Sequence, residues 1–104
     1  MLASKKEKLR SRGWKTGSAA EFLSLAPEEE AYIELRLRLS RGLRARRLRA
    51  RFTQVQLAEA IGSSQSRVAK MEAGDPTVSV DLLVRSLLAL GASDRDLASI
   101  ITGG

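Results

Sequence analysis

The stretch Phe52–Gly74, FTQVQLAEAIGSSQSRVAKMEAG, holds the start and stop signals of two short helices. Thr53 is followed three residues later by Gln56, a pairing that can form a capping box at a helix start. Gly62 then interrupts the apolar pattern, and Ser64 can cap a second helix. Because glycine readily adopts the left-handed backbone that a sharp turn requires, the stretch predicts two helices joined by a tight turn.

The apolar residues of these two helices predict how the helices pack. The first carries Leu57 and Ala58, and the second carries Val68 and Met71. The small side chain of Ala58 lets the second helix cross closely over the first, while Val68 turns one side of the second helix towards the core. Its other side stays free. Two short helices of this kind, preceded by a longer one, form a helix-turn-helix, in which the second helix enters the major groove of DNA.

The same stretch resembles the helix-turn-helix family that includes phage repressors, Cro proteins and xenobiotic-response-element-type bacterial regulators. The resemblance rests on Thr-Gln, Leu-Ala, Gly, Ser-Gln-Ser and Glu-x-Gly in register, and it extends over about residues 43–90, the five-helix body of that family. The chain departs from the family at Ser63, where an apolar residue is usual, and in the loop at residues 75–77, which is usually more basic.

The resemblance implies a set of DNA-binding residues. Gln65, the first residue of the second helix, resembles the glutamine that reads adenine through its paired donor and acceptor. Gln54 resembles the glutamine that holds a phosphate while touching the next helix. Arg67 points to the flanking backbone and suits a phosphate, although each of these residues could also be only a solvated polar side chain. The full predicted set is Thr53, Gln54, Ser64, Gln65, Ser66, Arg67 and Lys70.

The family also implies a structural ion pair. A glutamate at the end of the recognition helix pairs there with an arginine on the first helix, and the matching residues here are Glu72 and Arg47. We expect a partly buried pair that sets the angle between the two helices. Because this role is structural, the two residues are not counted as DNA-binding.

Upstream of this stretch, Pro27 and the glutamates at 28–30 predict another helix start, since carboxylates oppose the positive end of the helix dipole. Residues 33–39 alternate as a strand would, but good helix formers and the start signals favour a helix over about residues 28–50. Its arginines lie mainly between and opposite two apolar stripes. The stripes are Ile33, Leu37, Arg44 and Leu48, and Tyr32, Leu35, Leu39 and Leu43.

Downstream, Ser79 starts a strongly apolar helix that Gly91 closes, and Ser93 caps a last helix. The apolar residues at this end exceed what one small core would bury. They predict a homodimer that reads a pseudo-palindromic operator, unless they only complete the core of a monomer. These residues are Leu87, Leu88, Leu90, Leu97, Ile100 and Ile101.

The predicted fold is therefore all-α, a five-helix phage-repressor-like helix-turn-helix domain with a short N-terminal helical extension. Residues 1–30 would form a basic arm and the extension, in which a capping-box pattern at residues 18–21 opens a short helix. Residues 31–104 would form the DNA-binding domain.

Charge and composition point to a polyanionic partner and away from catalysis. The 18 basic and 12 acidic residues give a net charge of +6, which fits double-stranded DNA, although it could be only a solvated basic surface. The chain has no cysteine and no histidine, so no metal, no cofactor and no enzymatic activity is expected. No signal peptide and no membrane span is recognisable, which predicts a cytoplasmic, nucleoid-associated protein. The basic residues concentrate in the arm and in a cluster of eight arginines whose positive charge attracts phosphates, Arg36, Arg38, Arg41, Arg44, Arg46, Arg47, Arg49 and Arg51.

Two kinds of regulator remain open. The N-terminal extension and the segment Gln65–Leu83, QSRVAKMEAGDPTVSVDLL, resemble small antitoxins of bacterial toxin–antitoxin pairs, which repress their own operon and neutralise a partner toxin. The alternative is a stand-alone phage- or chromosome-encoded repressor without a toxin partner. A protein-interaction module or coactivator that uses the same fold is a third, weaker reading.

Overall fold

The computed structural model describes residues 26–103 of the chain. The basic arm and the short helix expected from residue 18 lie outside the described residues. The chain divides into two units, residues 1–34 and 35–104, and apart from the start of the first described helix the features discussed below belong to the second.

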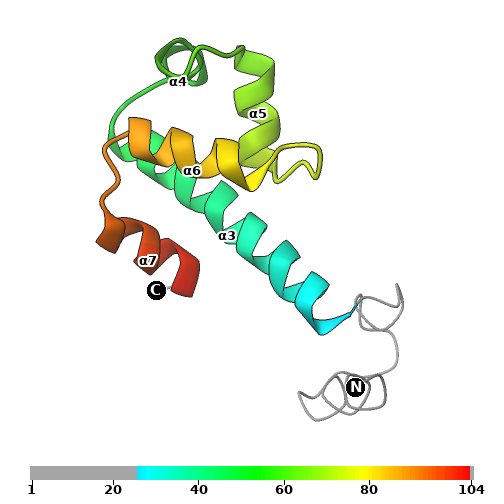
Figure 1. Ribbon diagram of the computed structural model, residues 1–104. Coiled ribbons are helices and arrows are strands. Elements are labelled where there is room, and N and C mark those ends of the chain that lie inside the picture. The colour runs from blue at the N-terminus through cyan, green and yellow to red at the C-terminus, as the bar shows by residue number, and fades with distance from the viewer. Residues whose placement is uncertain (1–25, 104) are drawn as a thin grey trace. The chain divides into compact units, whose positions relative to one another are not determined.

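The described residues form five helices and no strand, which confirms the all-α prediction. None of these helices combines the length and the apolar character that a membrane span needs. Figure 1 shows α6 lying across the C-terminal part of α3, with α4 and α5 at one end and α7 towards the other. The helices are α3 (Pro27–Arg49), α4 (Gln54–Ala60), α5 (Gln65–Ala73), α6 (Val80–Ala89) and α7 (Asp94–Thr102).

The long helix α3 begins and ends within one residue of its predicted bounds. Glutamates occupy its first turn and arginines its last turn, so both ends complement the helix dipole. Its buried face coincides with only part of the two predicted stripes, because Leu39 and Leu43 are their only buried members. Ile33 and Leu48 are 41% and 51% exposed, and Tyr32 is 50% exposed. The side chains that turn inwards are instead Arg36, Leu39, Ser40, Leu43 and Arg47.

This difference has a physical reason. The inward positions follow the three- and four-residue spacing of a helix face, and polar side chains occupy three of the five. Arg36 and Arg47 can be buried because partners from other helices and loops satisfy their guanidinium groups. A search for apolar periodicity alone does not find such positions.

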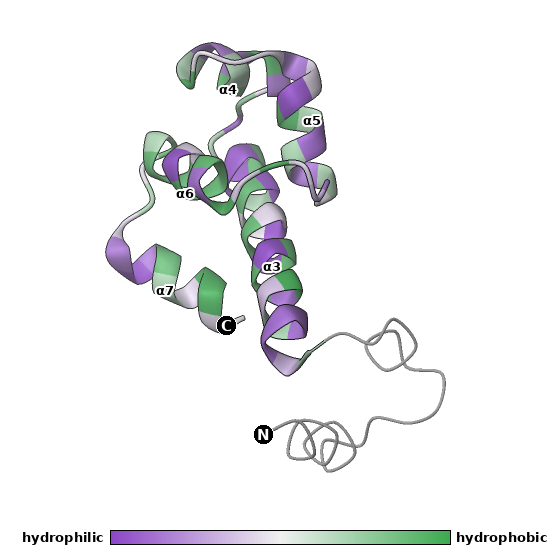
Figure 2. Cartoon of the chain, turned by 45° about the vertical axis from the view of Figure 1, so that its right-hand side comes forward, coloured by the Kyte–Doolittle hydropathy of each residue, from purple (hydrophilic) through white to green (hydrophobic). Residues whose placement is uncertain are grey.

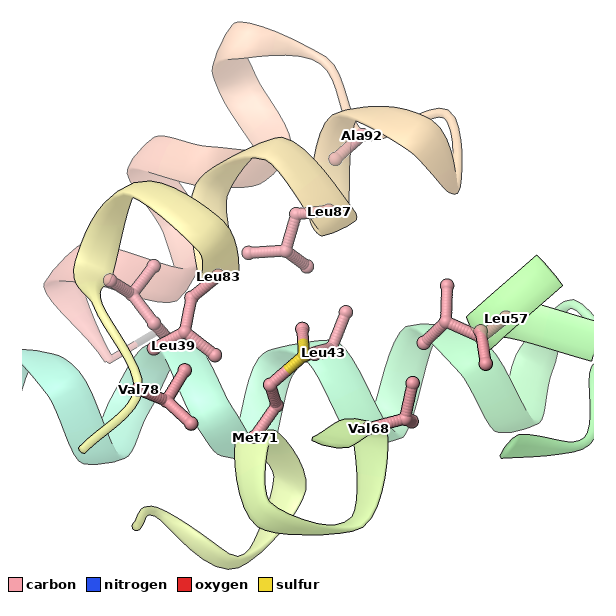
Figure 3. Close-up of a cluster of buried hydrophobic side chains, with 10 residues drawn as sticks. Leu39, Leu43, Leu57, Val68, Met71, Val78, Leu83, Leu87 and Ala92 are labelled. Atoms are coloured by element: carbon pink, nitrogen blue, oxygen red, sulfur yellow. The ribbon is translucent and has the colours of Figure 1, made fainter. Parts of the chain in front are cut away.

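The core combines residues from every helix except α7. Figure 3 shows Leu39 and Leu43 of α3 gathered with side chains from α4, α5 and α6. Val78 precedes α6 and Ala92 follows it, and both side chains are buried in the core, so the core contacts both ends of that helix. The fully buried apolar set is Leu39, Leu43, Leu57, Ala58, Val68, Met71, Val78, Leu83, Leu87 and Ala92.

The signals that bound α4 and α5 act as predicted. Thr53 accepts from the Gln56 amide while the Gln56 side chain accepts from the Thr53 amide, which completes the capping box. Ser64 caps α5 by accepting from the Arg67 amide. Gly62 has a φ of 66°, the left-handed conformation that its turn requires. Figure 2 shows hydrophilic and hydrophobic residues alternating along α5, as expected for a helix with one face on the core.

Candidate nucleic-acid interface

The position of α5 is set by a buried ion pair with α3. Arg47 Nη2 donates to Glu72 Oε1 at 2.9 Å, and Arg47 Nε donates to the other carboxylate oxygen. The two side chains are only 9% and 4% exposed, and the hydrogen bonds that Arg47 donates to the Glu72 carboxylate raise the pKa of Arg47 above its usual value. Arg47 Nη1 also donates to the carbonyl oxygen of Phe52 at 2.8 Å. This confirms the predicted pair and joins α3, α5 and the loop before α4.

Two glutamines continue the hydrogen bonds from this pair to the surface. Gln54 Nε2 donates to Glu72 Oε1 at 3.2 Å, and Gln65 Nε2 donates to Gln54 Oε1 at 2.6 Å. We call Glu72, Gln54 and Gln65 the amide relay. Gln54 is half-buried and Gln65 is exposed, so the relay runs from the core to the first residue of the recognition helix. The contact between the two glutamines agrees with the expectation for Gln54, whereas its bond to Glu72 was not predicted.

The remaining predicted site residues lie around the start of the two helices. Thr53 and Ser64 are exposed, and their hydroxyl oxygens serve as helix caps. The Ser66 hydroxyl lies 3.3 Å from that of Ser64. Arg67 and Lys70 are exposed on α5, and within residues 26–103 their side chains make no hydrogen bond or ion pair.

Helix geometry orders these side chains around α5. Each residue advances by about 100°, so Ser66 and Lys70 lie between Gln65 and Arg67 on the exposed arc. Gln65 and Glu72 are seven residues apart and share one side of the helix, towards α4. The exposed arc of α5 therefore has an amide at one edge and a guanidinium at the other.

The arginine cluster, which runs from α3 to Arg51, corrects the expectation that the arginine-rich helix as a whole meets phosphates. Arg36 Nη2 donates to the carbonyl oxygens of Asp75 and Val78, and so holds the loop between α5 and α6. Half of the cluster has such internal partners, because guanidinium groups satisfy carbonyl oxygens that turns and helix ends leave without a helical donor.

The other internal arginines hold the C-terminal helices. Arg38 Nε donates to the carbonyl oxygen of Ile101 at 2.9 Å. Arg46 donates to the carbonyl oxygens of Leu90 and Gly91 and pairs with Asp96 at 3.2 Å. Four arginines of the cluster are exposed, and their side chains make no hydrogen bond or ion pair among the described residues. These are Arg41, Arg44, Arg49 and Arg51.

Comparison with known proteins agrees with this geometry. A family model described as a helix-turn-helix domain matches residues 38–100, which span α4, α5, α6 and most of the second unit of the chain. The match also agrees with the resemblance to xenobiotic-response-element-type regulators. No curated relative and no solved structure matched the chain. The chain belongs to the helix-turn-helix domain family and is a DNA-binding protein of that family.

Proposed function

We propose that this protein is a sequence-specific transcriptional regulator that represses by occupying an operator. The observation that supports this reading most strongly is the orientation of the Gln65 amide. One N–H of Gln65 is used by Gln54, which leaves the carbonyl oxygen and the second N–H. This pair matches the N6 donor and the N7 acceptor on the major-groove edge of adenine.

Phosphate contacts would come from the basic side chains around that amide. Arg67 and Lys70 are exposed on α5, and their side chains make no hydrogen bond or ion pair among the described residues. Arg49 at the end of α3 and Arg51 after it, whose side chains also lack a partner among the described residues, add positive charge close to the start of α4. Such contacts position the protein on DNA without reading sequence.

Selection from a library of random DNA duplexes tests this function. We expect the full chain to enrich a defined sequence and to repress a reporter promoter that carries it. Gln65→Ala should lower repression while the circular dichroism spectrum stays unchanged. Enrichment of no sequence, with binding equal on all duplexes, would contradict a sequence-specific regulator.

We also propose that the regulator acts as a homodimer on two half-sites about 34 Å apart. Leu87 is buried, and Leu90, Leu97 and Ile100 pack against the core, so they serve the monomer. Leu88 and Ile101 remain 49% and 42% exposed and support the dimer. Sedimentation of the wild type and of Leu88→Glu, with Leu88→Ala as the milder control, tests this. A wild type that is monomeric both free and on its operator would exclude the dimer.

An antitoxin role is our finer proposal, and it rests on the resemblance of Gln65–Leu83 to small antitoxins. A partner toxin would then be encoded beside this gene, and co-expression should yield a complex of the two proteins. If the neighbouring product neither co-purifies nor is toxic, the stand-alone repressor is the better reading. In either role we propose a cytoplasmic protein. We also propose that it has no enzymatic activity, because the chain has neither histidine nor cysteine to act as a base or nucleophile.

A further inference from the structure

We infer that Glu72 decides which base Gln65 accepts, although Glu72 is itself almost wholly buried. The inference rests on the proposed reading of DNA by Gln65. It concerns the direction of the hydrogen bonds in the amide relay, which runs from Glu72 through Gln54 to Gln65. Glu72 is therefore a positioning residue for specificity.

The direction of the relay follows from the chemistry of its first member. A carboxylate that is paired with Arg47 can only accept hydrogen bonds. Gln54 must therefore turn its NH2 group towards Glu72, as it does. The carbonyl oxygen of the same amide then faces the opposite way, towards Gln65.

The same argument applies to the next amide. The Gln54 oxygen can only accept, so Gln65 must approach it with its NH2 group. This leaves the Gln65 oxygen and one N–H facing the groove. The acceptor of that pair suits the N6 amino group of adenine, whereas it would oppose the O6 oxygen of guanine.

Reversal of the relay would reverse this preference. If the first member offered a donor to Gln54, Gln54 would turn its oxygen inwards and its NH2 group towards Gln65. Gln65 would then accept with its oxygen and present only N–H donors to DNA. Guanine, which carries two acceptors in the major groove, would no longer be excluded.

The substitution Glu72→Gln makes this change. Glu72 Oε1 accepts from both Arg47 Nη2 and Gln54, while Oε2 accepts from Arg47 Nε. When the carbonyl oxygen of the new amide keeps the contact with Arg47 Nε, its NH2 group takes the Oε1 position and faces Gln54, at the expense of the hydrogen bond from Arg47 Nη2. The matched control is Glu59→Gln on α4. Glu59 is exposed and its side chain makes no hydrogen bond or ion pair among the described residues, so the control removes the same charge without touching the relay.

The experiment uses the full chain and four duplexes that differ at one base pair. That base pair is the position of the selected operator at which Gln65→Ala removes the base preference. We expect the wild type and Glu59→Gln to prefer adenine over guanine by about 10-fold or more, as a bidentate contact implies. Glu72→Gln should lower this ratio to about threefold or less, or favour guanine, while preferences at other positions stay unchanged.

A second variant keeps the test decisive if Glu72→Gln does not fold. Gln54→Met interrupts the relay but leaves the pair of Arg47 and Glu72 in place. The Gln65 amide would then turn freely, so the adenine preference should fall without a gain for guanine. A purely structural role of Glu72 would change stability and overall affinity, but not the ratio between the two bases.

Each outcome decides between the inference and the function on which it rests. A folded Gln54→Met variant that keeps the wild-type ratio overturns the relay. If Gln65→Ala changes the preference at no base pair, reading by Gln65 is itself wrong and the relay has nothing to orient.

Discussion

Gly42 of α3 lies directly against Ile100 of α7. A Cβ atom at position 42 would stand 2.8 Å from Ile100 Cγ2 and 2.9 Å from Cδ1. No residue of α7 is fully buried, so this close approach, together with the bonds from Arg38 and Arg46, holds the last helix on α3.

The first prediction follows from this contact. Gly42→Ala improves the helix propensity of α3 by about 1 kcal/mol but places a methyl group against Ile100. Ile100→Ala removes packing but also the clash. We therefore expect the double variant to be more stable than the sum of the two single changes by at least about 0.5 kcal/mol. Urea unfolding of the four proteins measures this coupling, and simple additivity would show that the approach is not tight.

The second prediction concerns Arg36, which donates to the carbonyl oxygens of Asp75 and Val78. Arg36→Met would leave buried acceptors without their donor and should lower the free energy of unfolding by about 1–3 kcal/mol. Arg44→Met is the matched control, since Arg44 is exposed on the same helix and should change stability by less than about 0.5 kcal/mol. Equal melting temperatures for the two variants would contradict an anchoring role.

The third prediction is a pH dependence. Hydrogen bonds from the backbone and side chain of Ser93 lower the pKa of Asp96 below the usual value of an aspartate. A lowered folded-state pKa stabilises the protein above the unfolded value, and this contribution is lost as the pH falls through the lower folded value. Asp96→Asn should therefore reduce the loss of stability between neutral pH and about pH 3.

Thermal melts at several pH values measure this effect. Asp94→Asn is the control, because it removes the same charge from the same turn of α7 and Asp94 makes no hydrogen bond through its side chain among the described residues. If both variants show the acid dependence of the wild type, the Ser93 cap does not contribute to it.

The fourth prediction separates Arg67 from Gln65, which occupy opposite edges of the exposed arc of α5. Arg67→Ala should weaken binding to operator and scrambled DNA alike and should reduce the slope of log K against log salt by about 0.9 per subunit. Gln65→Ala should cost about 1–3 kcal/mol on the operator and much less on scrambled DNA. Titrations at two salt concentrations compare them, and a loss confined to the operator for Arg67→Ala would place that residue on a base.

Local signals made much of the fold predictable. The caps Thr53 and Ser64 act on amides only three residues away, and Gly62 acts on its own backbone. Such interactions are complete within one helical turn, so they can be recognised in the sequence without knowledge of the rest of the chain. The pairing of Arg47 with Glu72 was also predictable, but only through the resemblance to a family.

The use of the polar side chains was decided by the tertiary structure. Arg36 donates a hydrogen bond to Val78, which lies 42 positions further along the sequence, and Gln54 donates one to Glu72, 18 positions further along. Nothing local distinguishes a guanidinium that will anchor a loop from one that will meet a phosphate, because both are long, charged and flexible. The sequence by itself determined where the helices begin and end, through contacts within a turn. Which arginines remain free for DNA, and which way Gln65 presents its amide, depends on partners that only packing brings together.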